Sequence, residues 1–124
     1  MEKTFVMLSA ALMFLAVAAG AFGSHALGSY FEKNRDLAAI YDTAVRYHMI
    51  HALALLGVAW AVTRWTDPLL TWSGWLMFAG ILIFSGSLYI LSLTGVRWLG
   101  AITPIGGVAF LAGWLCLLLA AWRA

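Results

Sequence analysis

The chain has 124 residues, of which 65% are hydrophobic and 10% are charged, and its net charge at pH 7 is +2. Soluble domains carry about 25% charged residues, so this composition cannot cover the surface of a small soluble fold and excludes that class. The charge is too small to indicate a nucleic-acid partner, and the single cysteine, Cys116, excludes an intramolecular disulfide. We therefore expect one integral membrane domain over residues 1–124, surrounded by the lipid bilayer.

The first apolar run, residues 4–24, is long enough to cross a bilayer core, which takes about 20 residues. Glu2-Lys3 before the run and Ala16-Val17-Ala18 within it also resemble a secretory signal peptide with its cleavage site. The apolar stretch is longer than the apolar region of a signal peptide. We therefore expect a retained membrane span.

The stretch 29–46 is strongly polar and precedes the second apolar run, residues 47–63. From Leu37 to His48 an apolar stripe recurs every three or four positions, which predicts an amphipathic helix with Asp36 available as its N-cap. That helix either lies on the membrane interface or continues directly into the second span.

Two further apolar runs, residues 69–93 and 99–122, complete four predicted spans. No run alternates with a period of two residues, so helices are favoured over strands. The sequence therefore predicts an all-α fold, an integral membrane four-helix bundle with an amphipathic helical segment between spans 1 and 2. Both chain termini would lie at one membrane face, here called the terminal face, and residues 24–46 and 95–97 at the opposite loop face.

Polar side chains gather in the half of the spans nearest the loop face, whereas six of the seven tryptophans lie in the other half, as in an interfacial aromatic belt. We interpret the polar group as a candidate ligand-binding pocket formed by His25, His48, His51, Ser85, Ser87, Tyr89 and Thr103. In the alternative interpretation the histidines bond to nearby backbone or tyrosines, and the hydroxyls bond within or between helices. Three imidazoles at one depth could also bind zinc or copper, but the pattern assigns no metal and no catalytic residue.

Small residues recur every four positions toward the end of the first span, and a Thr-Pro-Ile-Gly-Gly segment opens the fourth. Small residues at this spacing form a groove that another helix backbone can approach closely. The proline either occupies the first turn of its helix or marks a kink, and the glycines permit close contact. We therefore predict helix packing at six positions: Ala16, Gly20, Ser24, Pro104, Gly106 and Gly107.

Chemical groups that commonly identify a membrane enzyme or pump are missing from the spans. All five carboxylates fall at span ends or in loops, which removes the commonest proton relay. The sequence has no glycine-rich phosphate loop and no cysteine pair, and it places no nucleophile beside a base. A catalytic or pumping function therefore has little support from the residues.

Four motifs, in order, resemble the YgdD-like family of small membrane proteins, catalogued as domain of unknown function 423 and related to eukaryotic transmembrane protein 256. They are GAFGSHAL at 20–27, YHMIHALAL at 47–55, FSGSLY at 84–89 and LGAITPIGG at 99–107. One departure is Ser24, where the family motif has alanine, and the change in volume is small. The resemblance implies a multi-pass protein of the bacterial inner (cytoplasmic) membrane with four helices, and it implies no established activity.

These observations lead us to expect a non-enzymatic bundle that binds a lipid or small ligand, or that serves as a subunit or partner of a membrane complex. The alternative is a homo-oligomeric transporter or channel, since four short spans rarely enclose a path alone. An enzyme acting at the lipid headgroups, with histidine as base, and a metal-binding protein are further alternatives. We expect no cofactor, and a bound lipid or a second copy as the partner.

Overall fold

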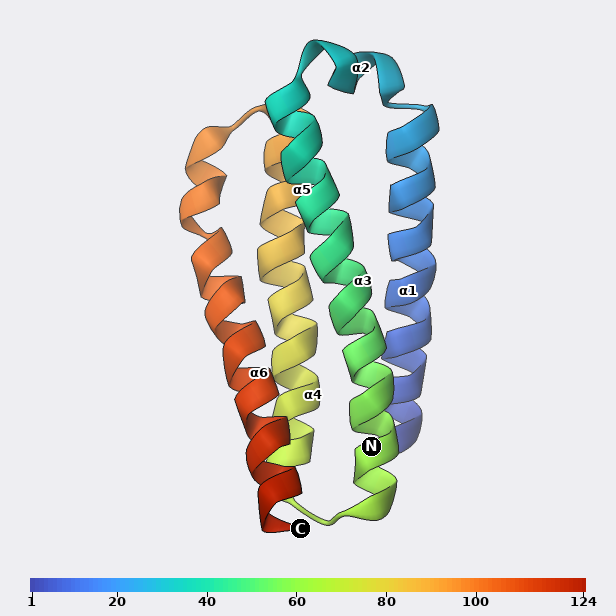
Figure 1. The fold of residues 1–124 in the computed structure, drawn as a ribbon, viewed down its shortest axis with the longest axis vertical. Helices are drawn as coiled ribbons and strands as arrows, with labels where there is room; N and C mark the ends of the chain where they lie inside the picture. Colours follow the sequence, from blue (N-terminus) through green and yellow to red (C-terminus); the bar gives the residue numbers. More distant parts are fainter.

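The computed structural model describes residues 1–124, and every element in it is helical (Figure 1). The elements in chain order are α1 (Glu2–His25), α2 (Gly28–Lys33), α3 (Arg35–Arg64), α4 (Pro68–Gly80), the π-helical turn η1 (Ile81–Ser85), α5 (Gly86–Thr94), the 3-10 helix η2 (Arg97–Ala101) and α6 (Thr103–Arg123). Four helical stretches are long and apolar enough to cross a membrane: Glu2–His25, Arg35–Arg64, Pro68–Thr94 and Arg97–Arg123. The predicted all-α membrane fold with four long apolar helices and a short helix between the first two is confirmed.

The polar segment before the second span divides into two helices. The short α2 lies across the loop face, and α3 then runs without a break from Arg35 to Arg64, about 45 Å at 1.5 Å per residue. The amphipathic segment therefore continues directly into the second span. The expectation that Asp36 caps this helix is wrong. Asn34 occupies the N-cap position without a side-chain cap, and Asp36 lies in the first turn, where it pairs with Arg97.

Local chemistry explains where the other long helices begin and end. The Asp67 carboxylate accepts a hydrogen bond from the Leu69 backbone N–H at 3.0 Å, and Pro68 follows at the first position of α4, where its missing N–H costs nothing. Gly95 ends α5 in the left-handed conformation, with φ of 77°, which glycine adopts without strain. Pro104 lies in the first turn of α6, so it starts this helix and does not kink it.

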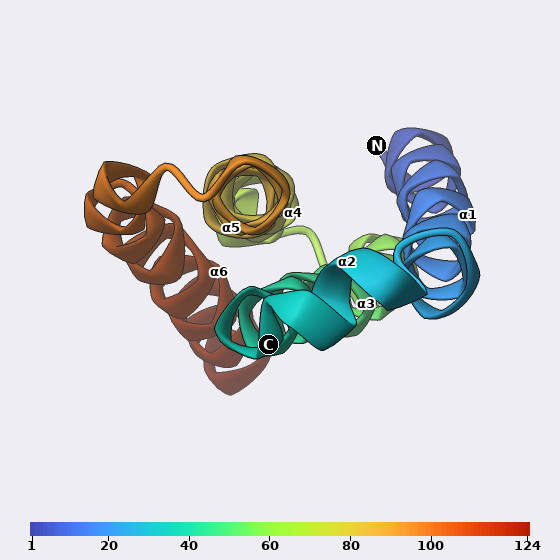
Figure 2. The same ribbon diagram turned by 90° about the horizontal axis from the view of Figure 1, so that it is seen from above.

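The four spans form an open array and not a closed ring. In Figure 2 the helix α3 and the stretch α4–α5 lie in the middle, with α1 beside α3 and α6 beside α4, so that α1 and α6 lie at opposite ends. Both termini lie at the terminal face (Figure 1). The molecule is therefore two antiparallel helix pairs, α1 with α3 and α4–α5 with α6, packed side by side.

Within each helix pair, an equivalent hydrogen bond joins the two helices. The Ser9 hydroxyl on α1 donates to the backbone carbonyl of Ala52 on α3, and the Ser73 hydroxyl on α4 donates to the carbonyl of Gly113 on α6, both at 2.7 Å. Each serine begins the pattern Ser-x-x-Leu-Met-Phe, at 9–14 and at 73–78. Both serines are buried, so each bond forms where hydroxyls have no water as an alternative partner.

Small residues allow the helices of each pair to approach closely. Ala16 is fully buried, and Gly20 lies against the side chain of Val45 on α3. The Ser24 side chain is exposed near the end of α1. Gly106 lies directly against another helix backbone, because a Cβ there would collide with the backbone of Phe84 in η1. Gly107 is less crowded, since its Cβ would only touch the Phe84 ring at 3.8 Å.

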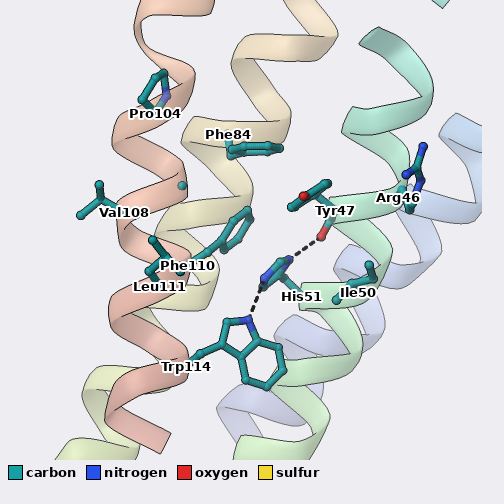
Figure 3. Close-up of a pocket in the computed structure, with 11 residues that line it drawn as sticks. Arg46, Tyr47, Ile50, His51, Phe84, Pro104, Val108, Phe110, Leu111 and Trp114 are labelled. Atoms are coloured by element: carbon teal, nitrogen blue, oxygen red, sulfur yellow. Dashed lines mark hydrogen bonds between the residues drawn. The ribbon is translucent and has the colours of Figure 1, made fainter. Parts of the chain in front are cut away.

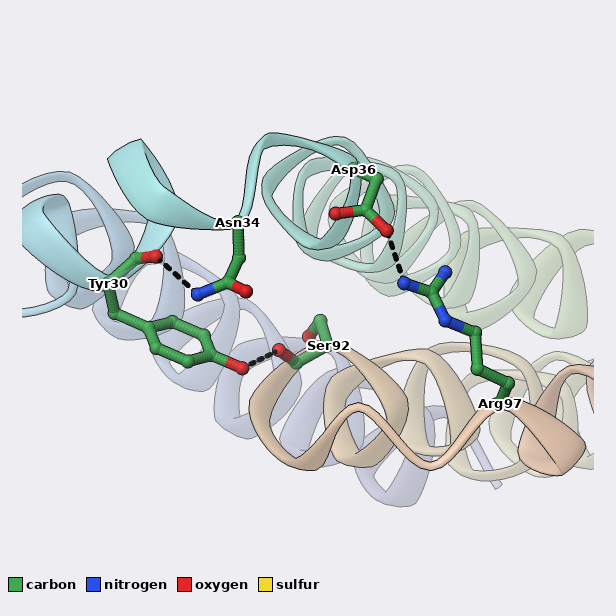
Figure 4. A network of polar contacts seen from close by, with 5 residues as sticks. All are labelled: Tyr30, Asn34, Asp36, Ser92 and Arg97. Atoms are coloured by element: carbon green, nitrogen blue, oxygen red, sulfur yellow. Dashed lines mark hydrogen bonds and ion pairs between the residues drawn. The ribbon is translucent and has the colours of Figure 1, made fainter.

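Polar contacts fasten the loop face of the array (Figure 4). The Tyr30 hydroxyl on α2 donates to the carbonyl of Ser92 on α5 at 2.8 Å, and the Asn34 amide donates to the Tyr30 carbonyl at 2.9 Å. Asp36 on α3 pairs with Arg97 on η2. These contacts hold α2 and the start of α3 against the end of the third span.

Candidate functional site

The three histidines do not come together. His25 is exposed at the end of α1, whereas His48 and His51 are buried in α3, with 5% and 4% of their surface exposed. His48 contacts Tyr89 on α5, and His51 contacts Trp114 on α6. No group of three or more His, Cys, Asp or Glu side chains is placed to hold a metal ion. The zinc or copper site considered from the sequence is therefore not formed by these histidines.

Both ring nitrogens of His51 have partners (Figure 3). The indole N–H of Trp114 donates to Nε2 at 3.0 Å, and Nδ1 lies 2.7 Å from the backbone carbonyl of Tyr47. An indole nitrogen can only donate, so Nε2 is the acceptor and the proton is on Nδ1. Phe110 stacks on the imidazole with ring centroids 3.5 Å apart and planes 10° apart. His51 is therefore a neutral imidazole whose tautomer and orientation are fixed by its neighbours.

His48 is bound differently, on the other flank of α3. Its Nδ1 lies 2.8 Å from the Tyr89 hydroxyl, and the two rings meet edge to face. Its Nε2 is buried and forms no hydrogen bond, with the backbone of Leu12 on α1 as a neighbour. Tyr89 in turn meets the ring of Tyr41, whose hydroxyl donates to the Ala19 carbonyl. This cluster links α1, α3 and α5.

The serine and threonine hydroxyls of the predicted pocket connect helices and do not bond to the histidines. Ser85 donates to the backbone carbonyl of Ala44 on α3 at 2.8 Å, and Ser87 shares a 2.6 Å hydrogen bond with Thr103 on α6. A serine nucleophile activated by histidine needs a direct hydrogen bond between them. The histidines instead bond to Tyr89, a backbone carbonyl and an indole, so this arrangement lacks a serine–histidine pair.

A cavity of about 660 Å³ lies between α3, η1 and α6, and we call it the α3–α6 groove (Figure 3). Its walls are mostly apolar and aromatic, and its size is that of a small-molecule site. The residues that line it are Arg46, Tyr47, Ile50, His51, Phe84, Pro104, Gly107, Val108, Phe110, Leu111 and Trp114. Of the residues predicted as a ligand pocket, only His51 lines this groove.

On α3 the lining of the α3–α6 groove begins at Arg46, and on α6 it runs from Pro104, nearer the loop face, to Trp114, toward the terminal face (Figure 3). Residues 47–63 carry no charge and span about 26 Å, close to the thickness of a bilayer core of about 30 Å. This uncharged interval has the length of a membrane span, with Arg46 and Arg64 at its two ends. The groove lies alongside the first part of the interval.

A second, smaller cavity of about 480 Å³ lies between α1 and α5. Its lining includes Tyr41, His48 and Tyr89, together with apolar residues of α1. His48 and His51 thus line different cavities, although they are only three positions apart on α3. The separation arises because α3 is a central helix with neighbours on both flanks.

Four long apolar helices, charged residues at their ends and buried hydroxyls bonded to neighbouring backbones define the class: this is a multi-pass α-helical membrane protein. Residues 19–107 match the family described as "Protein of unknown function (DUF423)", and the chain belongs to that family. The family resemblance drawn from the four motifs is confirmed.

The relatives are bacterial membrane proteins that align with this chain over nearly their whole length. The UPF0382 membrane protein YwdK of Bacillus subtilis is 49% identical over 121 residues, covering 96% of both chains. The UPF0382 membrane protein SH2409 of Staphylococcus haemolyticus is 43% identical over 122 residues, covering 98% of this chain and 97% of the relative. No solved structure matches the chain.

Proposed function

We propose that this protein is a non-enzymatic bundle that binds one acyl chain of a membrane lipid in the α3–α6 groove. The observation that carries the proposal is the groove itself, an apolar cavity of about 660 Å³ that begins at Arg46 and extends past His51. An acyl chain suits apolar walls at hydrocarbon depth, and a cationic side chain suits the headgroup at the mouth.

The rigidity of the groove walls supports a binding role. His51 is held by hydrogen bonds at both nitrogens and by stacking on Phe110. On the opposite wall Gly106 fixes α6 against the backbone of Phe84. A preformed site loses less conformational entropy when its ligand binds. The groove is therefore suited to retain one lipid longer than the open surface of the bundle does.

Other functions receive less support from the contacts. A polar path for transport requires free polar side chains, whereas Ser9, Ser73 and Ser85 each donate to a backbone carbonyl of another helix. An enzyme acting at the headgroups would use a histidine base. His51 is committed at both nitrogens, and the unbonded Nε2 of His48 is buried. Lipid binding requires no free polar group from these side chains.

A leucine at Gly107 tests the proposal, because its side chain would enter the groove without meeting backbone. The control is Gly57→Leu on α3, an exposed position where a Cβ meets nothing within 4 Å. Native mass spectrometry of the protein in mild detergent counts bound lipids. We expect one retained lipid in the parent and in Gly57→Leu, and none in Gly107→Leu. Equal lipid in all three proteins would contradict the proposal.

A further inference from the structure

The two helix pairs repeat one packing register. Ser9 on α1 corresponds to Ser73 on α4, 64 positions later in the chain. The carbonyls that these hydroxyls bond to belong to Ala52 on α3 and Gly113 on α6, which are 61 positions apart. Two offsets therefore relate the pairs, one for α1 and α4 and one for α3 and α6.

A second contact obeys the same two offsets. Gly20 on α1 faces Val45 on α3, and at the corresponding positions of the second pair Phe84 faces Gly106. The glycine has changed sides, but the positions in contact are the same. Each pair also starts at the terminal face and returns to it (Figure 1). The second pair is therefore a structural repeat of the first in the same membrane orientation.

The two repeats meet where α3 packs against α4 and η1. On α3 this contact includes Leu55 and Val58, which are fully buried. They belong to one hydrophobic cluster with Met77 on α4 and Ile81 on η1. The last helix of one repeat thus packs against the first helix of the next, an arrangement that further copies can continue.

The counterparts of these buried residues lie on the two outer helices and are accessible. On α6 they are Cys116, which is partly exposed, and Leu119, which is 42% exposed. On α1 they are Met13 and Val17, which together with Ala10 line a hollow of about 560 Å³. The outer helices therefore carry, at opposite ends of the array, the two halves of the contact made in its middle (Figure 2).

We propose that a second copy of this chain packs its α1 against the outer face of α6, as α4 packs against α3. The contact continues an interface that already exists within the chain. The directions agree, because α6 and the α1 of a copy in the same membrane orientation are antiparallel, as α3 and α4 are (Figure 1). Each copy then offers α6 to one neighbour and α1 to another, so the association is head-to-tail. It does not depend on lipid in the α3–α6 groove.

Disulfide cross-linking in membranes tests the contact, because a disulfide forms only where two Cα atoms lie within about 7 Å. A chain with Met13→Cys and Cys116→Ser is co-expressed with the parent, whose only cysteine is Cys116, and the two carry different tags. After oxidation with copper phenanthroline we expect a cross-linked dimer that contains both tags. Ala10→Cys, one turn away in the same hollow, is a second position for the α1 cysteine.

Leu15→Cys is the matched control, because Leu15 is 55% exposed but lies on the opposite side of α1 from Met13, two positions away. We expect the dimer to be lost there. Each chain is also oxidised alone, since a symmetric contact between two α1 helices or two α6 helices would cross-link one chain without the other. The proposal is overturned by a mixed dimer as abundant with Leu15→Cys as with Met13→Cys, by no mixed dimer at either hollow position, or by equal cross-linking of one chain alone.

Discussion

Among single residues, His51 is held by hydrogen bonds at both ring nitrogens and by stacking on one ring face. Its Nε2 accepts from Trp114, its Nδ1 donates to the Tyr47 carbonyl, and Phe110 covers its face. Removing one partner of a buried nitrogen leaves that nitrogen without a hydrogen bond in hydrocarbon, which is costly. His51 therefore has a structural role in lining the groove, and its hydrogen-bond partners determine how stably its side chain is positioned.

Trp114→Phe keeps an aromatic ring beside His51 but removes the indole N–H. We expect the free energy of unfolding to fall by about 1–2 kcal/mol, the range for such a hydrogen bond within a membrane protein plus some packing loss. Thermal unfolding in detergent measures it. Trp122→Phe is the control, because Trp122 is 84% exposed and has no such bond. Equal losses in the two variants would contradict the role given to the Trp114 bond.

At the scale of helices, backbone contact between α6 and η1 sets one wall of the groove. A Cβ at Gly106 would collide with the Phe84 backbone, and backbone cannot rotate away as a flexible side chain can. The π-helical turn η1 lies at this contact, as such turns often do at functional sites. The position of α6 relative to η1 therefore depends on the absence of a side chain at Gly106.

Gly106→Ala should push α6 away from η1 and lower the free energy of unfolding by about 2 kcal/mol, the middle of the range for overpacking. Gly86→Ala is the control, because a Cβ at Gly86 meets nothing within 4 Å. Replacing glycine by alanine in a helix there should raise stability by up to about 1 kcal/mol. Chemical or thermal unfolding in detergent compares the variants. The same change in the free energy of unfolding for both would contradict the role given to the contact between Gly106 and Phe84.

The helix ends at the terminal face are joined by Asp67, which caps α4 and pairs with Arg123 at the end of α6. The Arg123 guanidinium, and then the Leu69 N–H, hold the pKa of the Asp67 carboxyl below its usual value. A carboxyl with a lowered pKa stabilises the fold above the unfolded pKa of about 3.9 and loses this contribution as pH falls through its folded pKa.

Asp67→Asn keeps a capping side chain but removes the charge. The variant should be less stable than the parent at pH 7, and the difference should shrink as the pH falls below about 4. Unfolding curves in detergent at several pH values measure the difference. A gap that is the same at pH 7 and at low pH would show that the ion pair is not its cause.

At the scale of the whole molecule, the open array gives the protein two flanks with a cavity on each. Hydropathy and span length were enough to predict four helices, because lipid leaves few other structures. The position of the groove could not be predicted, since it depends on which helices are neighbours. His48 and His51 are three apart and were expected to share a site, but α3 is central and presents them to different helices.

Some of the site could have been found in the sequence. The repeated Ser-x-x-Leu-Met-Phe pattern at 9–14 and 73–78 indicates two related helix pairs, and it would have drawn attention to Ser9 and Ser73. The uncharged interval after Arg46 similarly draws attention to this residue as the last charge before the predicted second span. No signal identifies Phe110 or Trp114 as groove residues, because apolar residues also face lipid on the outside of every span.

Photocrosslinking distinguishes a lipid chain held in the α3–α6 groove from lipid spread evenly over the surface of the bundle. A phospholipid with a diazirine in its acyl chain would be activated in bilayers, and the labelled residues identified by peptide mass spectrometry. We expect labelling concentrated on Ile50, Val108 and Leu111, above that of exposed Phe14 on α1, and a loss of this excess in Gly107→Leu. Labelling of the groove no stronger than that of Phe14, and unchanged in Gly107→Leu, would contradict lipid binding in the groove.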